Sequence, residues 1–235
     1  MRAHSALFSV SQFAMYIEVA ERLDNRDARD INTAIVDTLA RKGWCVMPGF
    51  VPDGDIERLR NLALEQHTAE AFRPAGIGKG CNRAVNDSVR SDLICWIDPC
   101  NGDYRELCGE RFEMLRLAIN EQMYLCLLDL ESHFALYRPG AFYGKHLDQF
   151  QRGGRRKLTV LLYLNQEWQR EDGGELLLYA DTEPSSPPVR ILPHGGTLVC
   201  FMSELFPHEV LPARRDRLSL AGWYRTRENS LPISL

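Results

Sequence analysis

The sequence predicts a mainly β fold with packed helices, an α+β arrangement in which the second half of the chain forms a sandwich or barrel of the jelly-roll type. From residue 133 onward, short apolar runs are separated by turns rich in glycine and proline, without helical stretches between them. The first half instead shows apolar residues at helical spacing. With 235 residues and 45% apolar content, the chain is long enough to bury one full core.

Helices are expected near the N-terminus, over residues 9–23 and 30–42. In the second, Ile35 and Leu39 belong to a helical apolar pattern, and Gly43 follows as a stop signal. These helices should cover an apolar surface, because an amphipathic helix gains most of its stability from packing.

A strand and a third helix are expected next. Trp44-Cys45-Val46 is predicted to be a short strand. The sequence Pro52-Asp53-Gly54-Asp55 opens a helix, because proline is favoured at the first helical position. Ile56 and Leu59 then lie on one side of that helix.

Residues 73–90 differ from their surroundings, with glycine and proline at four positions, several basic residues and little periodicity. This pattern predicts a long loop, either functional or a tolerated surface insertion. The apolar run 93–97 and a helix over about 104–127 follow.

The second half is predicted to consist of eight short strands. They are expected at residues 133–137, 142–149, 157–164, 175–179, 189–192, 197–201, 208–211 and 217–225. Turn sequences such as Arg138-Pro139-Gly140 and Asp172-Gly173-Gly174 separate them. About eight strands suffice for a jelly roll.

Charge and cysteine content exclude several classes of protein. The formal charge of −4 gives no basic excess, so no nucleic-acid partner is expected. No apolar run approaches the roughly 20 residues that span a bilayer, and a signal-peptide pattern is absent, so we expect a soluble, cytoplasmic protein without a membrane partner. Seven cysteines without a C-x-x-C pair indicate reduced thiols. The alternative is a zinc site made of Cys95, Cys100 and Cys108.

His146 and Asp148 are the first candidate metal ligands. In a strand, residues two apart project from one face, so the imidazole and the carboxylate can converge on one ion. His208, at the start of a later strand, is a suitable third ligand. Two histidines and one carboxylate leave open positions on the metal, as in Fe(II) oxygenases. The same set also suits catalytic zinc, so a zinc hydrolase is a rival interpretation. The other histidines, His4, His67, His133 and His194, are interpreted as surface or satisfied core residues.

Arg217 begins the last predicted strand, nine positions after His208. Because Leu218 and the residues after it are apolar and alternate, Arg217 is expected to enter the core, where its guanidinium needs an anion. That anion is either a bound carboxylate or a structural partner such as Asp216.

A longer series of motifs surrounds these residues. It comprises Tyr137-x-Pro-Gly, His146-x-Asp148, Thr159-x3-Tyr163-Leu164-Asn165, Gly173-Gly174-Glu175-Leu176, Phe201, His208-Glu209-Val210-x-Pro212, Arg217 and Trp223-Tyr224. In this order they resemble the prolyl hydroxylase branch of the Fe(II) and 2-oxoglutarate dependent oxygenases, in particular the hypoxia-inducible-factor type and its bacterial relatives. The resemblance implies a double-stranded β-helix of the cupin-like kind. It implies an oxygenase domain over residues 44–235, preceded by a helical extension over residues 1–43.

The resemblance also implies the roles of individual residues. The metal ligands and catalytic residues would be His146, Asp148 and His208. The 2-oxoglutarate site would comprise Arg217 and Tyr163 at the distal carboxylate, Tyr137 near the metal-chelating end, and Thr159. The substrate residues would be Arg90 and Asp92 after the 73–90 loop, Arg155 or Arg156 at the entrance, and Trp223. Leu161, Val199 and Trp223 are interpreted either as an apolar wall that excludes water or as ordinary core.

The reaction implied is hydroxylation of a prolyl residue in a protein, with Fe(II), 2-oxoglutarate and O2, supported by ascorbate, and with succinate and CO2 as coproducts. Elongation factor Tu is the partner that the bacterial relatives suggest. The alternatives are an oxygenase of the same fold acting on a free amino acid or another small molecule, and a binding module without turnover. Intact ligand and clamp positions argue against the module.

Overall fold

The structure is a computed structural model that describes residues 28–76, 85–149, 154–181 and 186–227. The helix expected at residues 9–23 lies outside the described residues, as does the middle of the expected 73–90 loop, residues 77–84.

The described elements follow the predicted order. The helices are α2 (Ala28–Lys42), α3 (Asp53–Thr68), α4 (Gly102–Tyr104) and α5 (Glu110–Met123), with a π-helical turn (Arg105–Gly109) before α5 and a 3-10 turn at Arg170–Asp172. The strands are β1 (Trp44–Met47), β2 (Arg73–Pro74), β3 (Leu93–Trp96), β4 (Asp129–Tyr137), β5 (Tyr143–His146), β6 (Arg156–Tyr163), β7 (Leu176–Leu178), β8 (Val189–Ile191), β9 (Leu198–Met202), β10 (His208–Val210) and β11 (Arg217–Arg225).

The strands form two antiparallel sheets. The larger has the order β1-β9-β6-β11-β4-β3-β2, and the smaller has the order β5-β10-β7-β8. One apolar cluster joins the two sheets, since Phe201 and Val199 of the larger sheet pack in it with Leu176 and Leu178 of the smaller. This arrangement confirms the predicted mainly β fold of jelly-roll type.

The side chains of strand β6 point alternately to the two faces of the larger sheet. Leu158, Val160 and Leu162 are fully buried in the cluster that contacts the helices. Thr159 and Tyr163 point to the opposite face, which is turned toward the smaller sheet. We call this second face, on β1, β9, β6, β11, β4 and β3, the inner face.

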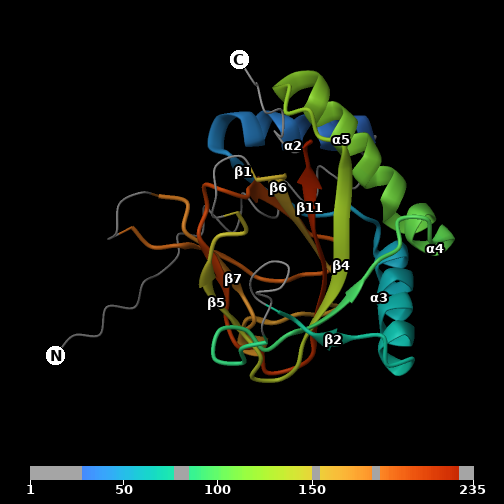
Figure 1. Cartoon of the computed structure of the whole chain (residues 1–235), viewed down its shortest axis with the longest axis vertical. Coiled ribbons are helices and arrows are strands. Elements are labelled where there is room, and N and C mark those ends of the chain that lie inside the picture. Colours follow the sequence, from blue (N-terminus) through green and yellow to red (C-terminus); the bar gives the residue numbers. More distant parts are fainter. Residues whose placement is uncertain (1–27, 77–84, 150–153, 182–185, 228–235) are drawn as a thin grey trace, which may run out of the picture.

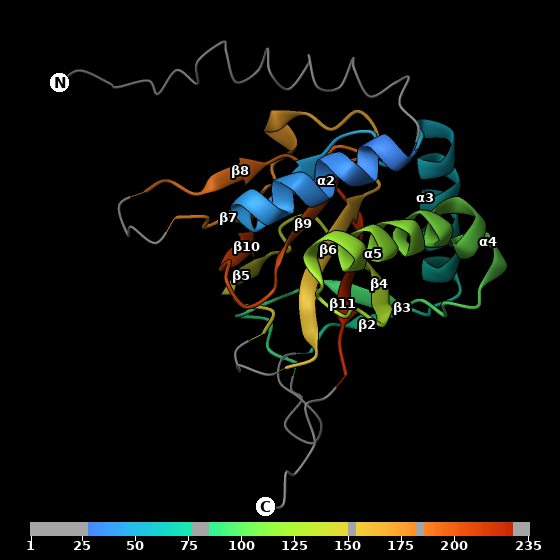
Figure 2. The ribbon, with the colours of Figure 1, turned by 90° about the horizontal axis from the view of Figure 1, so that it is seen from above.

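Helices cover the outer face of the larger sheet. Figures 1 and 2 show α2 and α5 lying side by side across it, with α3 beside them. Ile35 and Leu39 of α2 are buried in the same cluster as Leu115 and Ile119 of α5. Helix α2 therefore contributes to the main core. None of the described helices is long and apolar enough to cross a membrane.

The helix predicted to continue to residue 127 ends earlier. Its last residue is Met123, and Tyr124 adopts a left-handed conformation with φ of 54°. The Asn120 side chain then donates to the Leu127 carbonyl and accepts from the Leu127 N–H, both at 2.8 Å. This local turn reverses the chain, so that β4 begins at Asp129, four residues before the predicted start at 133.

Candidate active site

Two candidate metal ligands lie opposite each other in the smaller sheet. His146 of β5 and His208 of β10 are cross-strand partners, and their ring centroids are 4.2 Å apart. The predicted strand 142–149 is wrong at its C-terminal end, because β5 stops at His146 and Asp148 lies in a bend. The bend nevertheless brings the Asp148 carboxylate oxygens to 3.6 Å from His146 Nε2 and 3.7 Å from His208 Nε2.

The donor set fits a divalent metal. One ligand atom from each of His146, Asp148 and His208 lies within 4.8 Å of the others, the one such group found among the described residues. Both imidazoles face a backbone carbonyl through Nδ1, His146 with Gly144 at 2.8 Å and His208 with Phe206 at 3.1 Å. These contacts fix the tautomer that leaves each Nε2 lone pair available to a metal. Cys95, Cys100 and Cys108 form no comparable group in the described part.

Neighbouring side chains hold the ligands in place. The Thr159 hydroxyl donates to Asp148 Oδ2 at 2.7 Å and lies 2.8 Å from the Ser203 hydroxyl. The Tyr143 ring is stacked on His146, with centroids 3.5 Å apart and an interplanar angle of 12°. Thr159, expected near the co-substrate, is therefore in direct contact with a predicted metal ligand. Tyr143 and Ser203 were not predicted, and no motif in the sequence identifies them.

The site favours the protonation states that metal binding requires. Burial opposes ionisation of Asp148, but His208, His146 and the Thr159 hydroxyl outweigh it and hold the pKa of this carboxyl below its usual range. Burial lowers the pKa of His208 to about 4, against the attraction of Asp148. A carboxylate and a neutral imidazole are the forms that bind metal, and both exist at neutral pH.

Arg217 is a buried cation in the core, as predicted. Its side chain is 2% exposed, and its Nε donates to the Gly174 carbonyl at 2.8 Å. The guanidinium lies 4.9 Å from the Tyr137 ring centroid and 5.1 Å from that of Tyr163. Among the described residues no carboxylate is within ion-pair distance of Arg217, and Asp216 instead pairs with Arg138 at 2.5 Å.

Backbone geometry explains how Arg217 reaches this position. Gly174 has φ of +66°, and a Cβ at this position would lie 3.0 Å from the Arg217 Cδ. The glycine therefore leaves room for the arginine stem. In the β4–β11 register Arg217 is opposite Tyr137, whereas Tyr163 is opposite Ser219. Burial raises the pKa of Tyr137, so its phenol stays protonated. The pocket thus offers a fixed cation and phenol rings to an anion.

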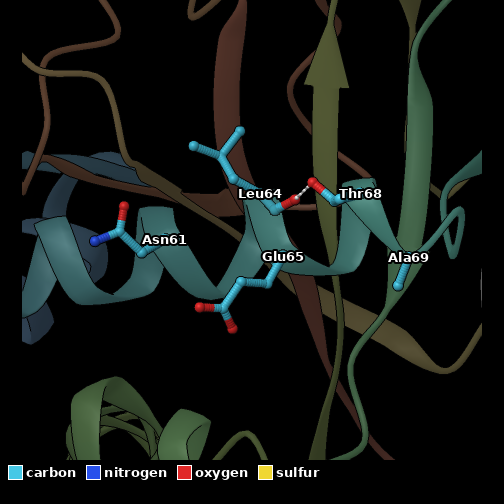
Figure 3. Close-up of a pocket in the computed structure, with 5 residues that line it drawn as sticks. All are labelled: Asn61, Leu64, Glu65, Thr68 and Ala69. Carbon is cyan, nitrogen blue, oxygen red and sulfur yellow. Dashed lines mark hydrogen bonds between the residues drawn. The ribbon is translucent and has the colours of Figure 1, made fainter.

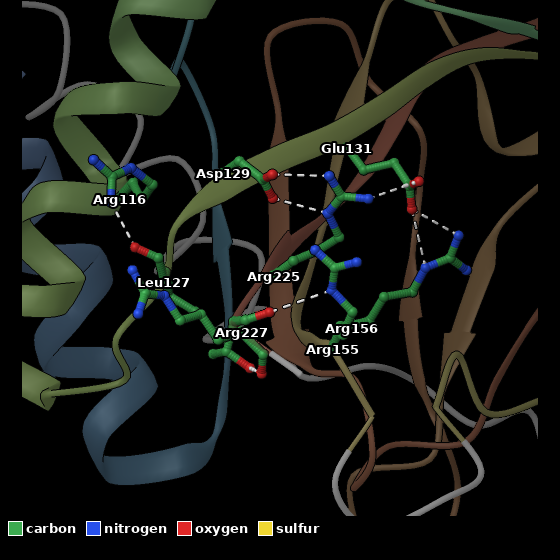
Figure 4. A network of polar contacts seen from close by, with 9 residues as sticks. Arg116, Leu127, Asp129, Glu131, Arg155, Arg156, Arg225 and Arg227 are labelled. Carbon is green, nitrogen blue, oxygen red and sulfur yellow. Dashed lines mark hydrogen bonds and ion pairs between the residues drawn. The ribbon is translucent and has the colours of Figure 1, made fainter. Parts of the chain in front are cut away.

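The structure separates the two arginines that the sequence left as alternatives. Arg156 lies 3.5 Å over the Trp223 ring and donates to Glu131 at 2.9 Å. Figure 4 shows that Glu131 also accepts from Arg225. Arg155 instead donates to the Thr226 carbonyl at 3.5 Å. Arg156 is therefore the one beside Trp223.

Arg90 and Asp92, expected to contact substrate, form an ion pair with N–O distances of 2.7 and 2.6 Å. Asp92 is 1% exposed. The Arg90 guanidinium lies 4.0 Å over the ring of Tyr143, which stacks on His146. The ion pair of Arg90 and Asp92 thus supports Tyr143 of the ligand strand, at the end of the predicted loop.

A surface hollow along helix α3 is separate from this site. It is lined by Asn61, Leu64, Glu65, Thr68 and Ala69, as Figure 3 shows. None of the candidate ligands or co-substrate residues lines it.

Comparison with known proteins agrees with the geometry of the site. Residues 132–225 match the family model of the 2OG-Fe(II) oxygenase superfamily. The chain is similar to the crystal structure of a Pseudomonas putida prolyl-4-hydroxylase, with 40% identity, a TM-score of 0.73, and coverage of 83% of this chain and 99% of that one.

Two further relatives extend the comparison. A Trichoplax adhaerens prolyl hydroxylase, solved with a hypoxia-inducible-factor peptide, has a TM-score of 0.75 at 23% identity, covering 92% of this chain and 93% of that one, which shows the shared fold. The Caenorhabditis elegans hypoxia-inducible factor prolyl hydroxylase is 29% identical over 215 residues, or 83% of this chain. The chain spans only 28% of that relative's length and 45% of human Egl nine homolog 1.

Proposed function

Because the chain belongs to the 2-oxoglutarate and Fe(II) dependent oxygenase superfamily, within its prolyl hydroxylases, we propose that it is a prolyl 4-hydroxylase acting on a proline of another protein. The observation that supports this most is one combination: a group of two histidines and an aspartate that could hold a metal ion, and a buried arginine without a carboxylate partner among the described residues.

The metal ligands in this proposal are His146, Asp148 and His208. Their contacts with backbone carbonyls and with the Thr159 hydroxyl preorganise the three donor atoms before metal binds. When bound, Fe(II) together with 2-oxoglutarate and O2 supplies the oxidising power for hydroxylating a C–H bond, with succinate and CO2 as coproducts.

The 2-oxoglutarate residues in this proposal are Arg217, Tyr163 and Tyr137. A guanidinium fork binds a carboxylate through two parallel hydrogen bonds, and the Nε bond to Gly174 orients that fork. The oxygenase accounts for this buried cation directly, because its co-substrate is a dicarboxylate, and the arginine therefore favours the oxygenase over a zinc hydrolase. Leu161 and Val199 are apolar residues of the inner face and would help to exclude water from the bound co-substrate.

The substrate is proposed to be a protein segment with an exposed proline. A relative of the same fold was solved with a peptide of its protein substrate, which supports a peptide more than a small molecule. Elongation factor Tu, suggested by the bacterial relatives, is the first partner to test, and it implies a cytoplasmic enzyme. Ascorbate is proposed to support turnover by keeping the metal reduced.

Intact-mass spectrometry tests the proposal. The enzyme is incubated with Fe(II), 2-oxoglutarate, ascorbate and purified elongation factor Tu, and in parallel with a lysate of the source organism. A gain of one oxygen atom on a protein, located to proline by fragmentation, is expected for the native enzyme and not for Asp148→Ala. Succinate formed with free amino acids, without any oxidised protein, would instead support the small-molecule alternative. No succinate with any substrate would contradict both.

A further inference from the structure

Four large apolar side chains are exposed along helix α5 and the turn that follows it. They are Met114 (46% exposed), Leu117 (52%), Tyr124 (82%) and Leu128 (48%), which we call the α5 strip. Met114 and Leu117 are three residues apart and share one side of the helix, and Tyr124 continues that line seven residues later. Only three other large apolar side chains are exposed in the described part of the chain. Apolar residues gathered in this way commonly form an interaction site.

The neighbouring helix α2 offers no comparable surface, although it lies beside α5 (Figure 2). Its exposed side chains among the described residues are Asp30, Thr33, Asp37, Ala40, Arg41 and Lys42. All except the alanine are polar, so α2 presents a solvated face where α5 presents an apolar one. An apolar segment that packs on this helical layer therefore fits α5.

A small hollow joins the α5 strip to the start of α2. It is lined by Ile31, Asn32, Phe50, Arg111 and Met114, the last of which belongs to the strip. Because Ile31 is in the first turn of α2, the chain enters this helix close to Met114. Arg111 is half-buried, and no acidic side chain of the described residues is within ion-pair distance of it. A cation is thus available here to an acidic residue that precedes α2.

The sequence before α2 predicts a helix that matches the α5 strip in length and polarity. At 1.5 Å per residue, the helix expected at residues 9–23, outside the described residues, would be about 22 Å long, and α5 is about 21 Å long. Its apolar residues Val10, Phe13, Ile17 and Ala20 recur at spacings of three and four. They would form one apolar stripe along the helix.

From these observations we propose that residues 9–23 bind along the α5 strip of the same chain as an amphipathic helix. Residues 24–27 link this helix to α2 and span up to about 14 Å. That length is enough to reach Met114 from the start of α2, since Ile31 and Met114 line the same hollow. The helix then lies antiparallel to α5, and its N-terminal end reaches Tyr124 in the turn after α5.

Charge and packing both support this contact. Glu21 and Asp24, at the end of the segment next to α2, supply the carboxylates that Arg111 lacks among the described residues. An isolated helix of this length is marginal in water, so burial of its apolar stripe against the α5 strip stabilises it. Helix α5 covers the outer face of the larger sheet, and the contact therefore uses none of the residues of the proposed oxygenase site.

Hydrogen–deuterium exchange of the full-length protein, followed by mass spectrometry, tests the proposal. The exchange of the backbone amides of residues 9–23 is compared with that of a synthetic peptide of residues 5–27. We expect exchange at least about tenfold slower in the protein than in the peptide, because a docked helix exchanges only when it opens locally. Equal exchange in the protein and the peptide would overturn the proposal.

Three substitutions in the full-length protein locate the contact. Leu117→Glu, in the α5 strip, and Ile17→Glu, in the segment, should each make residues 9–23 exchange as fast as the free peptide. Ala40→Glu adds the same charge to the exposed side of α2, and it should leave the protection of the segment as in native protein. Unchanged exchange of strands β4 and β11 in each variant shows that the fold is intact. Protection that survives Leu117→Glu, or that is lost in Ala40→Glu, is incompatible with docking on the α5 strip.

The dependence on protein concentration identifies the occupant. Protection within one chain should be constant over about a tenfold range of concentration, in a protein whose mass by light scattering is that of a monomer. Protection that rises with concentration, together with the mass of a dimer, would assign the strip to a second copy and overturn the intramolecular contact. None of these measurements needs turnover, so their outcome does not depend on the proposed function.

Discussion

Replacing Arg217 by alanine should weaken 2-oxoglutarate binding far more than metal binding. The native guanidinium is 2% exposed, and no carboxylate among the described residues neutralises it, so the bound dicarboxylate supplies the missing anion. Removing one partner of a buried charged pair costs about 3 to 5 kcal/mol. That corresponds to a rise in the dissociation constant of 2-oxoglutarate of about 10² to 4 × 10³-fold, at about 1.4 kcal/mol for each factor of ten. Two of the candidate ligands, His146 and His208, are on the other sheet, and Asp148 lies in the bend after β5, so the affinity for Fe(II) should be retained.

The affinity is measured by anaerobic titration of 2-oxoglutarate into Fe(II)-loaded protein, following the charge-transfer absorption of the complex. Arg217→Lys keeps the charge without the fork and should recover only part of the loss. Arg214→Ala, an exposed arginine three positions earlier, is the matched control and should bind normally. An Arg217→Ala protein that binds 2-oxoglutarate normally but unfolds more readily would show that the arginine is structural.

Three further predictions concern the same core. His208→Ala should lose Fe(II) binding, measured by metal analysis after dialysis, while its circular dichroism stays native; retained metal would refute the ligand assignment. In metal-free protein, burial lowers the pKa of His133 to about 3 and that of His208 to about 4. Between pH 6.5 and 4 the two histidines therefore take up protons in the unfolded chain but not in the folded protein. The free energy of unfolding should therefore decrease, as the pH falls, by about 1.4 kcal/mol per pH unit for each histidine. Urea unfolding of His133→Phe should show the contribution of one histidine less. A pH dependence as steep as that of the native protein would contradict this. Gly174→Ala should weaken 2-oxoglutarate binding because its Cβ would lie 3.0 Å from the Arg217 Cδ, whereas Gly140→Ala, with φ of +85° and nothing within 4 Å, controls for backbone strain alone.

Local patterns in the sequence were sufficient to predict most of the β fold. Strand β11 and its alternation were predicted over residues 217–225, because a half-buried strand must alternate. The π-helical turn at Arg105–Gly109 and the early stop at Met123 were missed. The stop depends on the Asn120 side chain bonding both backbone groups of Leu127, and no periodicity of apolar residues reveals such a contact.

The candidate ligands were predicted by residue type and spacing, whereas their supports were not. Asp148 was assigned to a strand, and the bend that aims its carboxylate depends on contacts with Thr159 and His208, which are distant in sequence. Tyr143 stacks on His146, but nothing in the sequence distinguishes this tyrosine from other strand residues. The Asp148 contacts with Thr159 and His208 form only once segments from different parts of the chain come together, so local sequence patterns do not reveal them.

On the inner face of the larger sheet, strand β11 holds its side chains in a fixed order. Arg217, buried and cationic, begins the strand and faces the proposed co-substrate pocket. Small side chains follow at Ser219 and Ala221, where bulk would fill the space between the two sheets. Trp223 then lies beside Thr159, which bonds the predicted ligand Asp148. Because alternate residues of one strand are fixed in spacing, this strand sets the distance between Arg217 and Trp223. A one-residue slip in its register would turn all four side chains to the helix-covered face and so remove the anion pocket.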